Sequence, residues 1–250
     1  MMKNSYWQER VSEVAQELFD EHNEILQRKL LKLYQKSMKQ ITKEVELLYY
    51  KLLEDTITRT DIWSYKHYQT LSKKLSILLA ELGAKEETLL NQHLEESLKA
   101  IYKRTVLPKA NSMVLNEMVI KQLIATSWSE KHFSQAIWDN KAKMIETLKT
   151  TLSESIVLGK SKDKAVESIM KKCNVGFRDA DRLVRTELMH MINEGQKRKY
   201  KDAGYTKVKV LVADDERLCE DCMQNDGKVF DLNEVSLPQH PFVDAPLFQF

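Results

Sequence analysis

The sequence is poor in residues that interrupt helices and in residues that cross-link small folds. It holds only six glycines, four prolines and three cysteines among 250 residues. Three cysteines are too few for a disulfide-dense secreted scaffold. The first glycine is Gly83 and the first proline is Pro108. Since glycine and proline are the main helix breakers, long helices are expected in the early part of the chain.

Long hydrophobic runs and a signal peptide are also missing. No apolar segment approaches the roughly 20 residues that a membrane-spanning helix needs. The first residues, MMKNSYWQERVSEVAQ, contain neither an apolar core nor a small-residue cleavage site. We therefore expect a protein without a membrane segment, made in a reducing cytoplasm. Charge of one sign is not in excess, because 39 Lys and Arg face 37 Asp and Glu. A basic surface for nucleic acid must therefore be local.

Apolar residues recur with helical spacing in the first 105 residues. From Trp7 to Ile25 they fall three, four or seven residues apart, and from Leu30 to Leu52 they continue a comparable stripe, with Lys, Gln and Glu between them. A stripe of this length without a clear internal cap predicts a helical hairpin or coiled-coil-like arm over residues 1–105. Gly83 is expected to end a helix, and Asn174-Val175-Gly176 is expected to form a turn.

Residues 106–250 are expected to form a second domain, helical to about residue 204 and followed by a small β module over 205–250. Gly204 lies where a C-terminal glycine would end the last helix. The segment KVKVLVA, residues 207–213, alternates and is rich in valine, which predicts a strand. A second short strand is expected at KVF, residues 228–230. The predicted fold class is thus mainly α, with a small C-terminal α+β module.

One cysteine pair in this module has the spacing of metal ligands. Cys219 and Cys222 form C-x-x-C, which supplies two thiolates to zinc from one tight turn. His240 and Asp244 are the strongest candidates to complete the site. Plain reduced thiols and a redox pair stay open as alternatives, although the acidic residues between the cysteines raise the thiol pKa and so disfavour redox chemistry. Cys173 is expected to be a lone thiol on the surface or in the core.

Glu187 falls beside the apolar stripe of the helix before Gly204, where a carboxylate needs a partner. Asp181 and Arg185 form an i,i+4 pair on the same helix. We interpret Arg185, Glu187 and Asp181 as a structural network of ion pairs and hydrogen bonds, in preference to a catalytic role. The sequence has no phosphate-binding glycine loop, no H-E-x-x-H and no G-x-S-x-G, and its six histidines are scattered singly. No enzymatic activity is expected.

A basic run follows on the same helix and continues into the predicted strand. It consists of Lys197, Arg198, Lys199, Lys201, Lys207 and Lys209, with Tyr200 and Tyr205 between them. Such a run is either an electrostatic footprint for DNA phosphates or a solvated helix end. The second meaning is the more common one.

Short motifs follow one another in a fixed order from Ala180 to Pro241. They are the A-x-x-L-V-R-T-E segment ending at Glu187, Asn193 with Gly195, Tyr200 with Gly204, Asp215 with Cys219 and Cys222, Asp226-Gly227 with Phe230, and His240-Pro241. No single piece is specific, but their order and spacing resemble the phage head-morphogenesis family, the minor head proteins also called Mu F-like. The resemblance covers roughly residues 110–241.

This resemblance implies a virion component present in few copies and incorporated near the portal, inside the capsid, during prohead assembly in the host cytoplasm. The implied partners are the portal protein and capsid or scaffold proteins. Some family members bind DNA or leave the capsid with it, and both remain open for this chain. Self-association into a homo-oligomer is also left open.

The chain departs from the family pattern after His240-Pro241. Family members usually continue with a C-R-C-like pair, whereas Phe242-Val243-Asp244-Ala245 follows here. The fourth cysteine ligand is therefore absent. Either Asp244 substitutes for it, or the metal is lost and packing of the apolar C-terminal tail takes over. The competing interpretation of the whole chain is a non-sequence-specific DNA-binding protein with a metal-linked C-terminal module.

Overall fold

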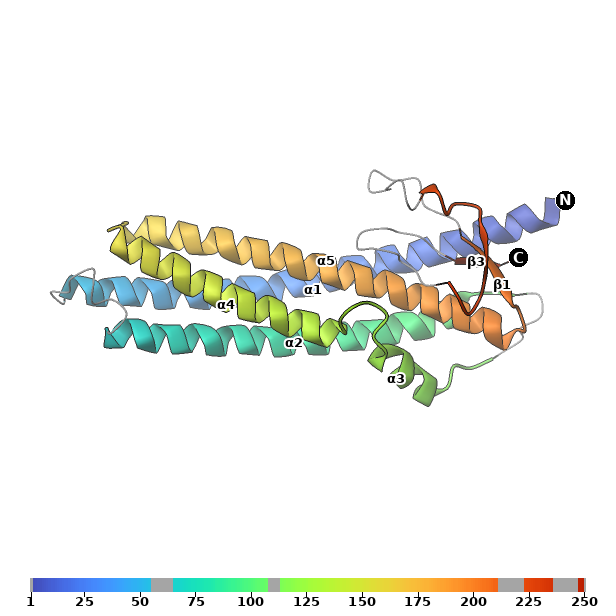
Figure 1. The fold of residues 1–250 in the computed structure, drawn as a ribbon, viewed down its shortest axis with the longest axis horizontal. Coiled ribbons are helices and arrows are strands. Elements are labelled where there is room, and N and C mark those ends of the chain that lie inside the picture. Colours follow the sequence, from blue (N-terminus) through green and yellow to red (C-terminus); the bar gives the residue numbers. More distant parts are fainter. Residues whose placement is uncertain (1, 55–64, 108–112, 211–222, 236–246, 250) are drawn as a thin grey trace. The chain divides into compact units, whose positions relative to one another are not determined.

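The computed structural model describes residues 2–54, 65–107, 113–210, 223–235 and 247–249. Within them the chain forms five helices and three short strands (Figure 1). The helices are α1 (Met2–Glu54), α2 (Lys66–Arg104), α3 (Glu117–Ala125), α4 (Phe133–Val157) and α5 (Lys162–Asp202), and the strands are β1 (Lys207–Val210), β2 (Val229–Asp231) and β3 (Leu247–Gln249). The mainly α class, the long N-terminal helix and the small C-terminal sheet are confirmed. None of the helices in these described ranges is long and apolar enough to cross a membrane.

The chain divides into two compact units, and each unit collects segments that are distant in sequence. Unit 1 comprises Met1–Gln27, Leu90–Phe133 and Arg182–Phe250, and unit 2 comprises Arg28–Leu89 and Ser134–Asp181. Helices α1, α2 and α5 each contribute one part to each unit. The domain boundary expected between residues 105 and 106 falls just after α2, inside unit 1, and stays a prediction.

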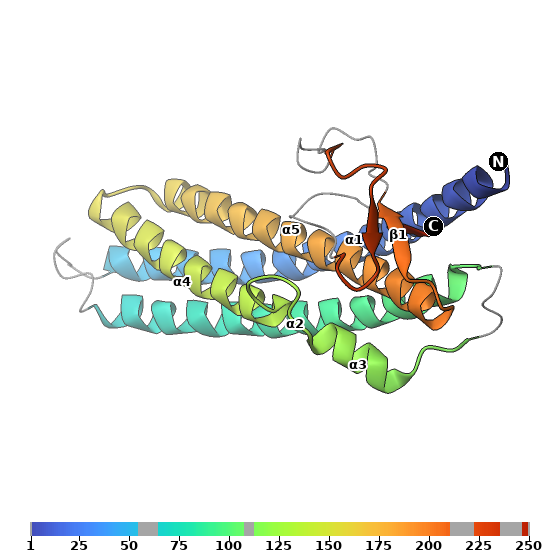
Figure 2. The same cartoon turned by 45° about the vertical axis from the view of Figure 1, so that its right-hand side comes forward.

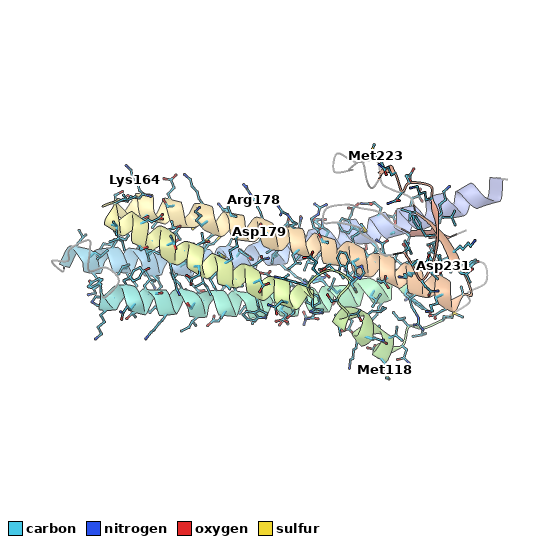
Figure 3. All side chains as sticks on the ribbon, in the orientation of Figure 1. Met118, Lys164, Arg178, Asp179, Met223 and Asp231 are labelled. Carbon is cyan, nitrogen blue, oxygen red and sulfur yellow. The ribbon has the colours of Figure 1, made fainter. Side chains whose placement is uncertain are left out.

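Unit 2 is built from four helical segments that run antiparallel to one another in chain order (Figures 1 and 2). Their buried side chains recur mostly at spacings of three or four residues, as in packed helical bundles. On α1 these residues are Leu30, Tyr34, Met38, Ile41, Val45 and Leu48, and on α2 they are Leu71, Leu75, Leu79 and Leu82. Charged residues take the opposite side, and Lys164 and Arg178 project outward from α5 in Figure 3.

Two glycines of unit 2 do not end helices, which corrects the sequence-based expectation. Gly83 lies inside α2, and Asn174-Val175-Gly176 is a helical part of α5 rather than a turn. The physical reason is close packing against α4. A Cβ atom at Gly83 would lie 3.1 Å from Lys141 Cγ, and one at Gly176 would lie 2.8 Å from Met144 Sδ. Gly83 therefore serves a close contact between helices, while the neighbour of Gly176 is the flexible end of the Met144 side chain.

Gly159 and Gly204 do end helices, and for Gly204 this confirms the expectation. Both have a positive φ, 64° and 82°, a backbone conformation that favours glycine. After α5 the Tyr205 amide donates to Tyr200 O at 3.0 Å and the Gly204 amide donates to Lys201 O at 3.0 Å. These paired bonds satisfy two of the carbonyls that a helix end leaves without partners. They turn the chain directly into β1.

Unit 1 has its core where α1, α2 and α5 meet. Ala15, Leu18 and Phe19 of α1 form one cluster with Ile101 of α2 and with Leu188, Met189 and Ile192 of α5. A second cluster joins Leu98 and Tyr102 of α2 to Leu115 and to Ile120 of α3. The Asn116 side chain accepts a hydrogen bond from the Met118 amide at 2.8 Å and so caps the start of α3.

The three strands of unit 1 form an antiparallel sheet in the order β2-β1-β3. Val208 and Val210 are buried on one face, so Lys207 and Lys209 lie on the other. The two expected strands are confirmed as β1 and β2, although the part of the first beyond Val210 lies outside the described residues. Strand β3 is new, and its pairing joins Leu247 to Val210.

Candidate functional site

The last part of α5 carries an unusual number of buried polar side chains. Between Val184 and Tyr200 most residues are buried, which is atypical for a helix with one apolar stripe. Apart from Thr186, the buried polar ones recur every three residues, as Glu187, His190, Asn193, Gln196 and Lys199. Because buried polar groups need partners, this row is the first place to look for chemistry.

Glu187 is the one acid of this row. Its side chain is 4% exposed, and Trp128 Nε1 donates a hydrogen bond to Glu187 Oε2 at 3.0 Å. Burial raises the pKa of Glu187 to about 7, and the hydrogen bond from Trp128 opposes this rise. The Trp128 ring stacks on His190, with 4.3 Å between the ring centroids. Glu187, Trp128 and His190 thus form one cluster between α5 and the segment before α4.

These contacts describe only part of the expected network of Arg185, Glu187 and Asp181. The observed partner of Glu187 is Trp128, which sequence reasoning missed. The Arg185 guanidinium lies 5.7 Å from the centroid of the Phe19 ring, within cation–π range. The pairing of Asp181 with Arg185 stays a prediction. The residue type was the one general signal, since a tryptophan that is removed from solvent usually finds a hydrogen-bond acceptor, and Trp128 is half-buried.

The basic run is divided between internal contacts and solvent. Lys199 is buried, with Nζ 4.5 Å from the centroid of the Tyr102 ring, and burial lowers the pKa of Lys199. Arg198 pairs with Asp202 at 3.0 Å, and Asp202 also accepts the Tyr102 hydroxyl at 2.7 Å. Lys197 donates to Val235 O at 2.8 Å. These three cations hold unit 1 together, while Lys201 and Lys207 are exposed and Lys209 is half-buried.

Two histidines that look isolated in the sequence meet in unit 1. His22 on α1 and His93 on α2 have ring centroids 6.0 Å apart, in an edge-to-face arrangement. Glu96 follows His93 by three residues on the same helix, with 3.6 Å between His93 Nδ1 and Glu96 Oε2. Each residue offers a ligand atom, and these atoms lie within 4.8 Å of one another. Burial lowers the pKa of His22, so the neutral imidazole is favoured at pH 7.

The structure does not describe the predicted zinc knuckle. Cys219, Cys222, His240 and Asp244 lie outside the described residues, and zinc binding by them stays a prediction. Cys173, expected to be a lone thiol, is a free and fully buried cysteine of unit 2. Burial raises its pKa to about 12, which makes it a poor nucleophile at neutral pH.

Comparison of the chain with protein-family models, with curated proteins and with solved structures gives no match.

Proposed function

We propose that this protein is a minor head protein of a tailed phage or prophage, incorporated near the portal during prohead assembly. The observation that carries the proposal is the ordered series of motifs between Ala180 and Pro241. Its implied partners are the portal protein and capsid or scaffold proteins. The place of action is the interior of the virion, after assembly in the host cytoplasm.

The motif residues that lie in the described ranges support this proposal through the roles they have in unit 1. Gly195 lies where a Cβ atom would come within 2.3 Å of Ile101 Cγ2, so α5 and α2 need glycine there. Gly204 and Gly227 have positive φ values of 82° and 73° at turns. Residues of this kind specify a fold rather than a reaction. A motif built from them is therefore consistent with an assembly protein.

Exposed apolar side chains on α1 support a role in protein contacts. Leu47, Tyr50 and Leu53 recur at three-residue spacing near the end of this helix and are 46%, 55% and 84% exposed. Large apolar side chains gathered on a surface often mark an interface with another protein. In the proposed function, this row is a contact for the portal or for another head protein.

Co-expression with the portal protein of the same phage or prophage tests the proposal. The full chain should co-purify with portal rings, and the association should persist at high salt because apolar contacts are not screened. The protein should also be found by mass spectrometry in purified proheads. Its absence from both portal rings and proheads would overturn the proposed function.

A matched pair of variants locates the contact. Leu53→Lys, in the row on α1, should weaken portal association. Ile77→Lys, at an exposed apolar residue of α2 outside that row, should leave it unchanged. Both variants change exposed side chains and should fold as the wild type does. If both bind as well as wild type, the row on α1 is not the contact, and the portal assay itself still decides the function.

DNA binding is the second candidate function, and the exposed cations Lys201 and Lys207 are the observation that favours it. The internal contacts of Lys197, Arg198 and Lys199 leave few charges of the basic run for phosphates. Within the proposed function, DNA contact is therefore secondary to contact with the portal.

A further inference from the structure

The cluster of His22, His93 and Glu96 has the donor set of a transition-metal site. His93 and Glu96 lie three residues apart on α2, which places both side chains on one face of the helix. His22 reaches them from α1, within the same compact unit. Two imidazole nitrogens and one carboxylate oxygen are a ligand set that zinc uses in proteins.

The three residues of the cluster differ in how far they are exposed to solvent. His93 is almost fully buried and His22 is half-buried, whereas the Glu96 side chain is 63% exposed. The Nδ1 atom of His22 is itself buried and has no hydrogen-bond partner among the described residues. A buried nitrogen without a partner carries a desolvation cost, and a metal ion would remove that cost.

The charges around the cluster also suit a cation. Glu96 and Glu21 both act on His22 with negative charge, and Arg104 acts with positive charge. The Arg104 guanidinium is paired with the Glu21 carboxylate, 3.0 Å between Nη2 and Oε2. Since that pair is nearly neutral as a whole, the Glu96 carboxylate remains as the charge that a divalent ion would neutralise.

We propose that His22, His93 and Glu96 bind one divalent transition-metal ion of the zinc class. The two imidazoles and the carboxylate supply three ligands, and a water molecule takes the fourth position from the open side at Glu96. Ligand atoms of a tetrahedral zinc lie roughly 3.3 Å apart, given zinc–nitrogen distances of about 2.0 Å. His93 Nδ1 and Glu96 Oε2 are already 3.6 Å apart, and the three ligand atoms lie within 4.8 Å of one another, so side-chain rotations are enough to bring them to one ion. The ion would join α1 to α2 inside unit 1.

This site uses none of the residues of the predicted C-x-x-C knuckle, so the two can be separated by mutation. Glu96→Gln and His22→Gln remove one ligand each and change little volume. His67→Gln, at an exposed histidine of unit 2, is the matched control. The double variant Cys219→Ser with Cys222→Ser removes the knuckle and leaves the histidine cluster intact.

Zinc and cobalt titrations of the purified full chain test the proposal, after removal of metal with a chelator and dialysis. Isothermal titration should show one equivalent bound by the double cysteine variant, and wild type and His67→Gln should bind at least this equivalent. Glu96→Gln and His22→Gln should lose affinity for this equivalent by at least about tenfold. A free zinc concentration about 100 times Kd should raise the melting temperature of the double cysteine variant by about 5–10 °C, and should not do so once Glu96→Gln is added to that variant.

Three results would overturn the proposal. They are no saturable binding by wild type, equal binding by Glu96→Gln and His22→Gln, and loss of all binding in the double cysteine variant while that variant retains wild-type far-UV circular dichroism. His93→Gln is a further variant, but His93 is buried and its replacement could unfold the protein. Glu96 is exposed, so its variant decides the question on a folded chain.

Discussion

Lys141 Nζ on α4 lies 2.6 Å from Glu86 Oε2 on α2, and the two side chains are 2% and 0% exposed. Lys141 also donates a hydrogen bond to the Tyr34 hydroxyl at 2.6 Å, and that hydroxyl lies 3.1 Å from Glu86 Oε2. Burial, followed by the negative charge of Glu86, raises the pKa of Tyr34. An ion pair and a phenol from three helices thus replace apolar packing at the centre of unit 2.

Removing one partner of this pair should be strongly destabilising. Glu86→Leu or Lys141→Met should lower the free energy of unfolding by about 3–5 kcal/mol, because each leaves a buried charge without its counterion. The double variant Glu86→Leu with Lys141→Met should recover much of that loss, since no charge is then buried. Urea denaturation of the two single variants and the double variant measures the coupling. Additive losses would show that the pair does not act as a unit.

Two glycines of α5 should respond differently to substitution by alanine. At Gly195 a Cβ atom would lie 2.3 Å from Ile101 Cγ2 and 3.3 Å from the Leu98 carbonyl oxygen, so Gly195→Ala should cost about 1–3 kcal/mol of stability. At Gly176 the nearest atom is the flexible Met144 sulfur, and alanine gains about 1 kcal/mol in helix propensity. Gly176→Ala should therefore be neutral or stabilising. Thermal unfolding of both variants checks the prediction, and equal destabilisation would contradict it.

These glycines also show what the sequence could and could not predict. Gly204 follows a charged helix end and precedes a valine-rich strand, so its role as a helix end was readable. Gly83 and Gly176 are also glycines, but neither follows a charged helix end or precedes a predicted strand. Whether glycine ends a helix or admits a neighbouring helix depends on what packs against it, and that information is not local.

The candidate sites also depend on packing between segments that are distant in the sequence. The sequence marked Glu187 as a carboxylate beside an apolar stripe, but Trp128, its partner, lies in another part of the chain. His22 and His93 are separated by most of α1 and α2, and only the antiparallel packing of these helices brings them together. Strand β3 has three residues, too few for a periodic pattern, and its pairing with β1 is set by the tertiary fold.

The buried Glu187 should make stability depend on pH between about 4.5 and 7. Its pKa in the folded chain, about 7, is above the ordinary value of 4.5, so the folded state holds the proton more tightly than the unfolded state. The resulting stabilisation is complete below pH 4.5 and is lost as the pH rises to about 7. At about 1.4 kcal/mol per pKa unit, the loss is about 3 kcal/mol.

Glu187→Gln removes this titration. The variant should match wild type near pH 4.5 and become more stable than wild type by about 2–3 kcal/mol at pH 8. Urea denaturation at four pH values measures the difference, and the exposed Glu130→Gln provides the baseline. The difference between variant and wild type isolates Glu187, because all other ionisable groups are the same in both chains. A difference that does not change with pH would contradict the assignment.

The contacts of the basic run predict weak DNA binding with a shallow salt dependence. Lys201, Lys207 and Lys209 remain for phosphates, so a plot of log affinity against log salt should have a slope of about −2 to −3 for random-sequence DNA. Lys201→Glu with Lys207→Glu should abolish this binding. Lys164→Glu with Arg178→Glu, two exposed cations of unit 2, is the matched control and should have little effect. A slope of about −6 or steeper would instead favour a dedicated DNA-binding protein, because only contacts beyond the exposed part of the run could supply it.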